Sequence, residues 1–435
     1  MDHDLTSSLV HRHTTALIQG TKIGRLYHDH AACLGLACCL LPAGSEQVAK
    51  YLGIAGVGTY WAAGVAILIV AREYLIPRFV SRVTRAEGWI LALVTLGCLF
   101  LALRLIYPLA DSGMFGGGGD SDDALTLGAQ ALLAHQYPYE PSTYLGAPVT
   151  YLPGSLLLAV PFVMMGNVAY QNTFWLALFL VAMKIHLADI RQAVLLLWTT
   201  LLCARVLQLL VTGGELLASS IYVALFVLFA MRSLMAGQPG WRPWVAAVLL
   251  GVGLSSRTNY LLLVPILLSA AIQIRGWKEA AGYAAAATTS FLAVTLPFWF
   301  HDPQTFVVAC LRPQNFAALA QNSVLPHADL AVPLASTLFA VGLSFRRLKN
   351  WDTQVLSHCA LVQAFPILAI LVLSSVEARG LEMTYAGYGV HFLFFGAVAS
   401  WTGFVRIGAP GGYPDVRQTL ECRMIEPYAR VSDAS

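Results

Sequence analysis

Residues 88–109 read GWILALVTLGCLFLALRLIYPL and hold a single charged side chain, Arg104. A run of this length matches the ~20 apolar residues that a helix needs to cross the hydrocarbon core of a bilayer. Similar apolar segments recur along the chain, at 31–44, 52–71, 88–109, 151–166, 173–190, 193–212, 216–236, 244–255, 261–274, 283–300, 329–345, 355–376 and 384–405. Because these runs do not alternate in the period of a membrane barrel strand, the pattern predicts a multi-pass helical membrane protein.

The composition of the 435 residues agrees with this interpretation, since 57% are hydrophobic and 11% are charged. A soluble globular protein has about 25% charged residues, so a soluble enzyme is excluded, and so is a disordered chain. The formal net charge of +3 comes without a Lys/Arg-rich run, which argues against a nucleic-acid partner. The eight cysteines form no CxxC pair, and we therefore predict neither a zinc site nor a disulfide framework.

Lysine and arginine concentrate in short cytoplasmic loops of membrane proteins, and this rule orients the chain. It predicts an all-α polytopic bundle of about 12 transmembrane helices, with segment 151–166 as the one that does not cross. Residues 1–30 and 406–435 become cytosolic tails, and 31–405 form a single transmembrane catalytic domain in the cell (inner) membrane. The outer loops are then 111–150 and 301–328, and no lysine or arginine occurs between Arg104 and Lys184.

The first outer loop carries the densest group of acids in the chain. From Gly116 to Ser155 it reads GGGGDSDDALTLGAQALLAHQYPYEPSTYLGAPVTYLPGS, in which Asp120, Asp122 and Asp123 stand where a helix over 122–135 would begin. One acid at a helix N-terminus is explained by capping alone, whereas three of four positions exceed what a cap requires. We expect this apolar helix to lie at the membrane surface, and the acids to be candidate catalytic groups.

This loop resembles the first extracytoplasmic loop of polyprenyl-phosphate-sugar-dependent membrane glycosyltransferases of the C-type superfamily. It is most similar to the bacterial polyprenyl-phosphate-mannose-dependent mannosyltransferase branch. The shared elements are an Asp, a small-residue helix ending in Leu-Leu, an aromatic-Pro-aromatic turn and a Tyr before the next helix. They correspond here to Asp122, GAQALLAH, Tyr137-Pro138-Tyr139 and Tyr151-Leu152-Pro153. Two departures concern the branch: Thr126 stands where Tyr is usual, and TYLPG replaces a double proline.

The resemblance implies an inverting transfer of a sugar, a hexose such as mannose, from a polyprenyl-phosphate donor to a lipid or glycan acceptor at the extracytoplasmic face. Asp122 best matches the position of the base, with Asp123 one residue out of register and Asp120 as the remaining candidate. Membrane lipids are the surrounding partners. We predict no cofactor and no metal site, although Asp120-Ser121-Asp122 has the form of a DxD motif.

Further resemblances supply candidates for the other groups. Gly213-Gly214-Glu215 stands where the family often has Gly-Gln, GVGLSSRTNYLLLVP contains the basic residue Arg257, and AQNSVLPH ends at His327. We expect Arg257, with Arg312 as second candidate, to bind the donor phosphate through its guanidinium. The residues expected to contact substrate are Tyr139, Tyr151, Glu215, His327 and His391. For Arg257 the alternative is snorkelling from a helix end, and for each histidine it is an ordinary structural role.

Two alternatives remain open at this point. The first is a membrane transporter or a flippase for lipid-linked sugars, which would carry ionisable residues in its spans and paired interrupted helices. The second is a non-catalytic membrane scaffold, in which every acid of the outer face would tolerate neutral substitution.

Arg205 lies inside an apolar run and is expected to pair with a carboxylate such as Glu215.

Overall fold

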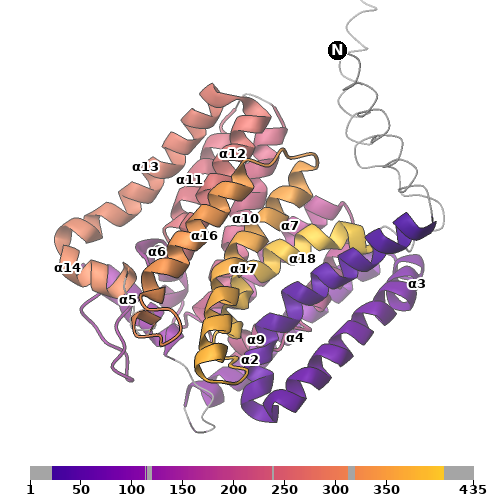
Figure 1. Ribbon diagram of the computed structural model, residues 1–435, viewed down its shortest axis with the longest axis horizontal. Helices are drawn as coiled ribbons and strands as arrows, with labels where there is room; N and C mark the ends of the chain where they lie inside the picture. The colour runs from indigo at the N-terminus through magenta and orange to yellow at the C-terminus, as the bar shows by residue number, and fades with distance from the viewer. Residues whose placement is uncertain (1–21, 113, 115–119, 238–239, 312–318, 406–435) are drawn as a thin grey trace, which may run out of the picture.

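The computed structural model describes residues 22–112, 114, 120–237, 240–311 and 319–405, and these residues form helices joined by turns (Figure 1). The only strand-like pairing among them is an isolated bridge between Ser142 and Pro148. The predicted cytosolic tails, except for 22–30, lie outside the described residues. The elements are α2 (Lys22–Val70), η1 (Ala71–Leu75), α3 (Ile76–Arg82), α4 (Arg85–Asp111), α5 (Ser121–Leu133), α6 (Pro153–Met164), α7 (Tyr170–Leu187), α8 (Ile190–Thr200), α9 (Ala204–Val211), α10 (Glu215–Met235), α11 (Arg242–Leu254), η2 (Thr258–Leu263), α12 (Val264–Arg275), α13 (Trp277–His301), α14 (Pro303–Phe306), η3 (Val307–Leu311), α16 (Ala328–Ser344), α17 (Trp351–Glu377), η4 (Ala386–Gly389) and α18 (Val390–Val405).

Seven helical stretches of the described chain are long and apolar enough to cross a membrane, and the all-α multi-pass prediction is thereby confirmed. They are Ala31–Arg82, Arg85–Asp111, Glu215–Met235, Thr258–Arg275, Trp277–His301, Trp351–Glu377 and Ala386–Val405. The bent pair α8–α9 would be an eighth. The predicted number of about 12 crossings stays a prediction.

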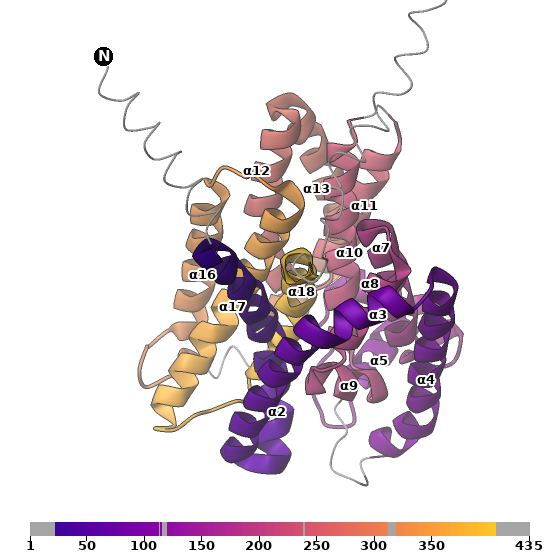
Figure 2. The ribbon, with the colours of Figure 1, turned by 90° about the vertical axis from the view of Figure 1, so that its right-hand side faces the viewer.

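The first of these stretches contains a reversal of the chain at Gly53. This glycine has φ 67°, outside the helical region, and divides α2 into two arms. Trp61 Nε1 donates to Ser45 Oγ across the arms at 2.9 Å, and a Cβ at Gly44 would lie 2.3 Å from the Tyr60 hydroxyl oxygen. Figure 2 shows α2 descending and returning towards α3. The two arms correspond to the predicted segments 31–44 and 52–71.

The apolar segment 193–212 is interrupted, because its two helices, α8 and α9, meet at an angle of 89°. The hydroxyls of Thr199 and Thr200 bond back to the carbonyls of Leu195 and Leu197, which competes with helix continuation. The carbonyl of Leu202, freed at the break, accepts from the Tyr60 hydroxyl at 3.2 Å. A neighbouring helix thus satisfies a polar group that an interrupted span exposes.

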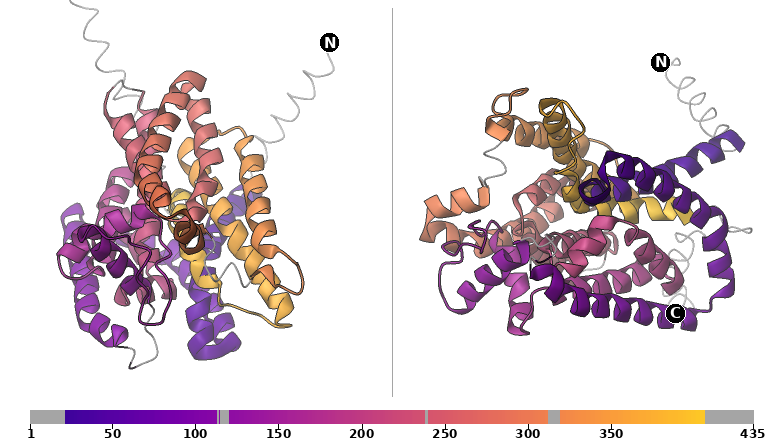
Figure 3. Two further views of the ribbon diagram at one scale, coloured as in Figure 1. Left: turned by 90° about the vertical axis from the view of Figure 1, so that its left-hand side faces the viewer. Right: turned by 90° about the horizontal axis from the view of Figure 1, so that it is seen from below.

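Both predicted outer loops contain helical structure. The helix expected over 122–135 is present as α5, and its position at a membrane surface stays a prediction. Segment 151–166 forms only the 12-residue helix α6, as its short apolar run suggested. The stretch 301–328, predicted as a loop, contains α14 and η3 up to Leu311, because Asp302 caps α14 by accepting from the amides of Gln304 and Thr305. Leu125 of α5 and Phe306 of α14 belong to one buried hydrophobic cluster, and Figure 3 gives two further views of the ribbon in which these helices lie.

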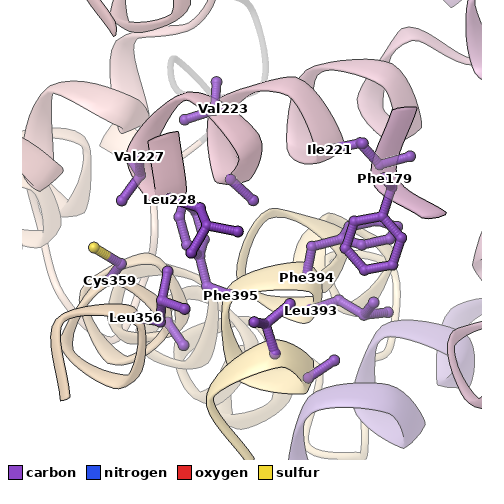
Figure 4. Packing of buried hydrophobic residues seen from close by; sticks show 14 of the residues in the cluster. Phe179, Ile221, Val223, Val227, Leu228, Leu356, Cys359, Leu393, Phe394 and Phe395 are labelled. Atoms are coloured by element: carbon purple, nitrogen blue, oxygen red, sulfur yellow. The ribbon is translucent and has the colours of Figure 1, made fainter. Parts of the chain in front are cut away.

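The core forms around α10 and α18, whose residues are mostly buried, whereas α13 is mostly exposed. Figure 4 shows Phe179 of α7 and Leu356 of α17 packing with α10 and α18, including Phe394 and Phe395. Burial of α10 fixes Glu215, its first residue, at the interior end of this core. Large apolar side chains such as Leu93 and Leu334 face outward, as a lipid-facing surface requires.

Candidate active site

Asp122 lies in the first turn of α5, and its side chain is only 2% exposed. The hydroxyl of Tyr107, near the end of α4, donates to Asp122 Oδ2 at 2.7 Å. Gly213 packs against both side chains: a Cβ there would lie 2.8 Å from Tyr107 Cε2 and 3.3 Å from Asp122 Cβ. Since Gly213 also has φ 72°, glycine is needed for both conformation and space.

The surroundings of Asp122 suit a group that exchanges a proton near neutral pH. Burial raises the pKa of this carboxyl to about 6, and the neighbouring Asp123 and Asp111 carboxylates act in the same direction. The Tyr107 hydrogen bond opposes that rise in pKa. None of the ion pairs between described residues involves Asp122, so no lysine or arginine of the described chain neutralises it. Such a carboxylate can accept a proton as a general base.

Three acids converge at this point, but they are not the two acids of the Asp120-Ser121-Asp122 motif. Carboxylate oxygens of Asp111, Asp122 and Asp123 all lie within 4.8 Å of one another, with Asp111 exposed. This is the group of described residues that could hold a hard divalent cation through oxygen ligands. Burial, with Asp111 and Asp120 nearby, raises the pKa of Asp123. Asp120 is engaged elsewhere, since its Oδ2 accepts from Thr143 Oγ1 at 2.8 Å.

The second half of the site is a buried ion pair between Glu215 and Arg257. Arg257 Nε donates to Glu215 Oε2 at 2.8 Å, and Nη2 of the same guanidinium reaches the same oxygen. Ser155 Oγ donates to the other carboxylate oxygen, Oε1, at 2.9 Å. The side chain of Glu215 is 1% exposed and that of Arg257 is 21% exposed, so the pair is buried on the carboxylate side and the Arg257 side chain is only partly covered. Arg257 is therefore already paired, which the sequence did not reveal.

The expectation that Arg205 pairs with a carboxylate is confirmed, but Glu215, the partner named for it, is wrong. Arg205 Nη1 lies 3.8 Å from Glu46 Oε1 and donates to Gln208 Oε1 at 2.8 Å. The break between α8 and α9 places Arg205 on the short helix α9, beside α2. The bend between the two helices is therefore what decides that Arg205 meets Glu46 and not Glu215.

Tyr139 and Tyr151, expected to contact substrate, are both buried, at 3% exposed each. The Tyr139 hydroxyl donates to the carbonyl oxygen of Tyr151 at 2.9 Å, and the Tyr151 hydroxyl donates to that of Ser121 at 2.7 Å. The guanidinium carbon of Arg257 lies 4.9 Å from the centre of the Tyr151 ring. Both hydroxyls therefore bond main-chain carbonyls, and the ring of Tyr151 contacts Arg257.

The two halves form one site because a short segment joins them. Gly213 lies against Asp122, and Glu215, two residues further on, binds Arg257. Two extended residues span at most about 7 Å. The structure thus brings together Asp122, Asp123, Tyr151, Glu215 and Arg257 from the predicted set.

Of the other predicted residues, Asp120 and Tyr139 border this group, His391 lies behind it, His327 is exposed at the start of α16, and Arg312 is outside the described residues. His391 is 4% exposed, and its Nδ1 lies 2.9 Å from the hydroxyl of Tyr260, whose amide donates to the Arg257 carbonyl. This histidine therefore belongs to the buried network behind Arg257. His327 is exposed and precedes α16 with φ 60°. Arg312 lies in the stretch 312–318, outside the described residues.

Sequence reasoning missed Tyr107 and Ser155. A tyrosine near the end of a span is typical of the interfacial belt, so its pattern does not distinguish Tyr107 from other aromatic residues. Ser155 follows Gly154, where a Cβ would lie 2.3 Å from the Val252 carbonyl oxygen. The glycine of the Pro153-Gly154-Ser155 helix start was therefore the only sequence signal for Ser155, because a glycine there permits α6 to approach the turn at 255–257 closely.

Comparison with protein-family models, curated proteins and solved structures found no match to this chain.

Proposed function

We propose that the protein is an inverting membrane glycosyltransferase that moves a hexose such as mannose from a polyprenyl-phosphate donor to a lipid or glycan acceptor. The observation that carries this proposal is the juxtaposition of a buried carboxylate that pairs with no described cation, Asp122, and a partly exposed arginine side chain, Arg257. Displacement at an anomeric carbon requires both a base and a positive charge for the departing phosphate. The resemblance of the first loop to the C-type superfamily supports the same reaction.

In the proposed reaction Asp122 accepts the proton of the acceptor hydroxyl while that oxygen forms a bond to the anomeric carbon. The bond from the anomeric carbon to the phosphate oxygen breaks, and polyprenyl phosphate leaves with the electron pair. Attack opposite to the leaving group inverts the anomeric configuration in a single displacement. Arg257 donates hydrogen bonds to the developing phosphate charge from the part of its guanidinium that Glu215 does not occupy.

The proposal includes 12 crossings, two cytosolic termini and a site at the extracytoplasmic face. The distribution of charge supports this orientation. In Figure 2 the connection between α12 and α13 lies at the upper end, whereas α5 and α9 lie towards the lower end. Arg275 and Lys278 occupy the former connection, and the acidic turn of α5 belongs to the latter end.

A second candidate function, transport or flipping of a lipid-linked sugar, is favoured by one specific observation. The broken pair α8–α9 carries Arg205 beside Glu46, and interrupted helices with ionisable residues are typical of transporter binding sites. In that case Glu46 and Arg205, and not Asp122, would be the essential pair.

Purified protein in nanodiscs, given radiolabelled polyprenyl-phosphate mannose and a crude membrane-lipid acceptor, tests the proposal. We expect label to move to the acceptor with inversion at the anomeric carbon, and Asp122→Asn to abolish the transfer. Vesicles with donor in one leaflet test the alternative: translocation without new glycosidic product, lost in Glu46→Gln and kept in Asp122→Asn, would favour the transporter.

A further inference from the structure

We infer that Tyr151 is a positioning residue that links donor-phosphate binding at Arg257 to the alignment of Asp122. This inference rests on the proposed function and assigns Tyr151 a role between the two halves of the site. The residue contacts no reacting atom in this role. It acts through its two ends, the ring face and the hydroxyl.

The ring of Tyr151 is the surface on which Arg257 rests. The guanidinium carbon lies 4.9 Å from the ring centre, within the range of a cation–π contact, and Glu215 holds the guanidinium edge from another direction. A phosphate that takes the remaining guanidinium donors therefore acts directly on the group that the Tyr151 ring supports.

The hydroxyl of Tyr151 reaches the helix that carries the base. It donates to the main-chain carbonyl of Ser121 at 2.7 Å, and Asp122 is the next residue. The N-cap residue Asp120 forms no side-chain cap to the amides of α5, so the helix start is held by side-chain bonds from elsewhere: this phenol on the Ser121 carbonyl, Thr143 on Asp120 and Tyr107 on Asp122. Loss of the phenol would loosen the peptide that orients the Asp122 side chain.

The segment around Tyr151 is braced so that it moves with the Arg257 turn. The Leu152 amide donates to the Ser256 carbonyl at 3.1 Å, and the Gly154 amide donates to the Ser255 carbonyl at 2.6 Å. A displacement of the turn at 255–257 is thereby transmitted to Tyr151 instead of being absorbed by a flexible loop.

The test compares Tyr151→Phe with wild type and with Tyr137→Phe as matched control. The control variant Tyr137→Phe also loses a buried hydroxyl that bonds main-chain carbonyls, in this case those of Phe298 and Asp302. The Tyr137 hydroxyl does not bond Ser121 or Arg257. Hydrogen exchange of the α5 amides is followed by mass spectrometry with and without a polyprenyl monophosphate, alongside kcat and donor KM. Added lipid should slow exchange in wild type and Tyr137→Phe, and should not do so in Tyr151→Phe. We expect kcat of Tyr151→Phe to fall about three- to tenfold, the worth of one hydrogen bond, with an unchanged donor KM.

The outcomes separate this inference from the proposed function. Lipid-dependent protection of α5 that Tyr151→Phe removes, in a wild type without sugar transfer, would uphold the link and overturn the glycosyltransferase. Normal transfer with identical exchange in Tyr151→Phe and wild type would overturn the link alone. A wild type that does not bind polyprenyl monophosphate overturns both. Should Tyr151→Phe fail to fold, Arg257→Lys at saturating lipid breaks the ring contact instead and is expected to lose the same protection.

Discussion

Asp122 and Glu215 are buried almost equally, at 2% and 1% exposed, yet their neighbours give them different chemistry. The Asp122 half of the site offers a neutral phenol and two further carboxylates, so no cation among the described residues compensates for its burial. The Glu215 half offers Arg257 and the hydroxyl of Ser155, which together occupy both carboxylate oxygens. Glu215 is therefore a structural partner of a cation, whereas Asp122 keeps its capacity to accept a proton.

The difference teaches that burial alone does not identify a base. Both charges of a buried carboxylate–arginine pair lose their hydration when the chain folds. The pair therefore stabilises the fold only by comparison with a variant that has lost one of the two partners. A buried carboxylate without such a partner opposes folding and is retained where its reactivity is useful. The following predictions, ordered from the largest effect to the smallest, test this contrast.

Asp122→Asn is expected to lower the rate of sugar transfer about a thousandfold, within the range of general-base catalysis, because the amide cannot accept the proton. Transfer of labelled mannose measures the loss, and thermal unfolding in detergent verifies the fold. Asp123→Asn is the matched control, one residue away and partly exposed. Equal or greater loss in Asp123→Asn would reassign the base.

Glu215→Gln is expected to lower the free energy of unfolding by about 3 kcal/mol, because it leaves the Arg257 charge without its partner in a largely buried site. Thermal unfolding of the purified protein measures this destabilisation. The double variant Glu215→Gln with Arg257→Met should recover most of the stability. A single variant as stable as wild type would contradict the assigned ion pair.

Activity and stability should respond to pH in opposite directions. Burial raises the pKa of Asp122 from its ordinary 3.8 to about 6, so the contribution of this group to stability is fully present below pH 3.8 and is lost as pH rises through 6. The loss amounts to about 3 kcal/mol at most. Transfer requires the ionised carboxylate and should rise with a midpoint near pH 6.

Tyr107→Phe sharpens that prediction, because the Tyr107 hydrogen bond lowers the Asp122 pKa. The midpoint of the transfer rate should therefore move to higher pH in this variant, whereas Tyr137→Phe should leave it in place. A pH–rate profile of both variants measures the shift. An unmoved midpoint would mean that Asp122 is not the titrating group.

Thr143→Val should have the smallest effect, a loss of about 1 kcal/mol in unfolding free energy and less than about fivefold in transfer rate. The variant removes the hydroxyl that bonds Asp120 Oδ2, and Asp120 stands outside the three converging acids. Thermal unfolding and transfer assays measure both quantities. A loss as large as that of Asp122→Asn would return Asp120 to the list of base candidates.

Much of the fold could be predicted from local patterns in the chain. Apolar runs near 88–109 and 355–376 appear as α4 and α17, and the helix after the glycine run appears as α5. The break within 193–212 could not, because Thr199, Thr200 and a neighbouring Tyr60 create it together. Of the candidate site, Asp122 and Arg257 were indicated by the resemblance of the first loop and of segment 251–265 to the C-type superfamily, and their roles stay predictions.

What the sequence determined by itself is the class of protein and the position of its helices, since a run without charges must satisfy its backbone internally in lipid. Only the tertiary structure decided which side chains become the partners of the two buried carboxylates. Glu215 meets Arg257 across 42 residues of chain, and Tyr107 meets Asp122 across the glycine run that separates their helices. A carboxylate's chemistry depends on the charge and hydrogen bonds within a few ångströms, and residues distant in sequence supply them here.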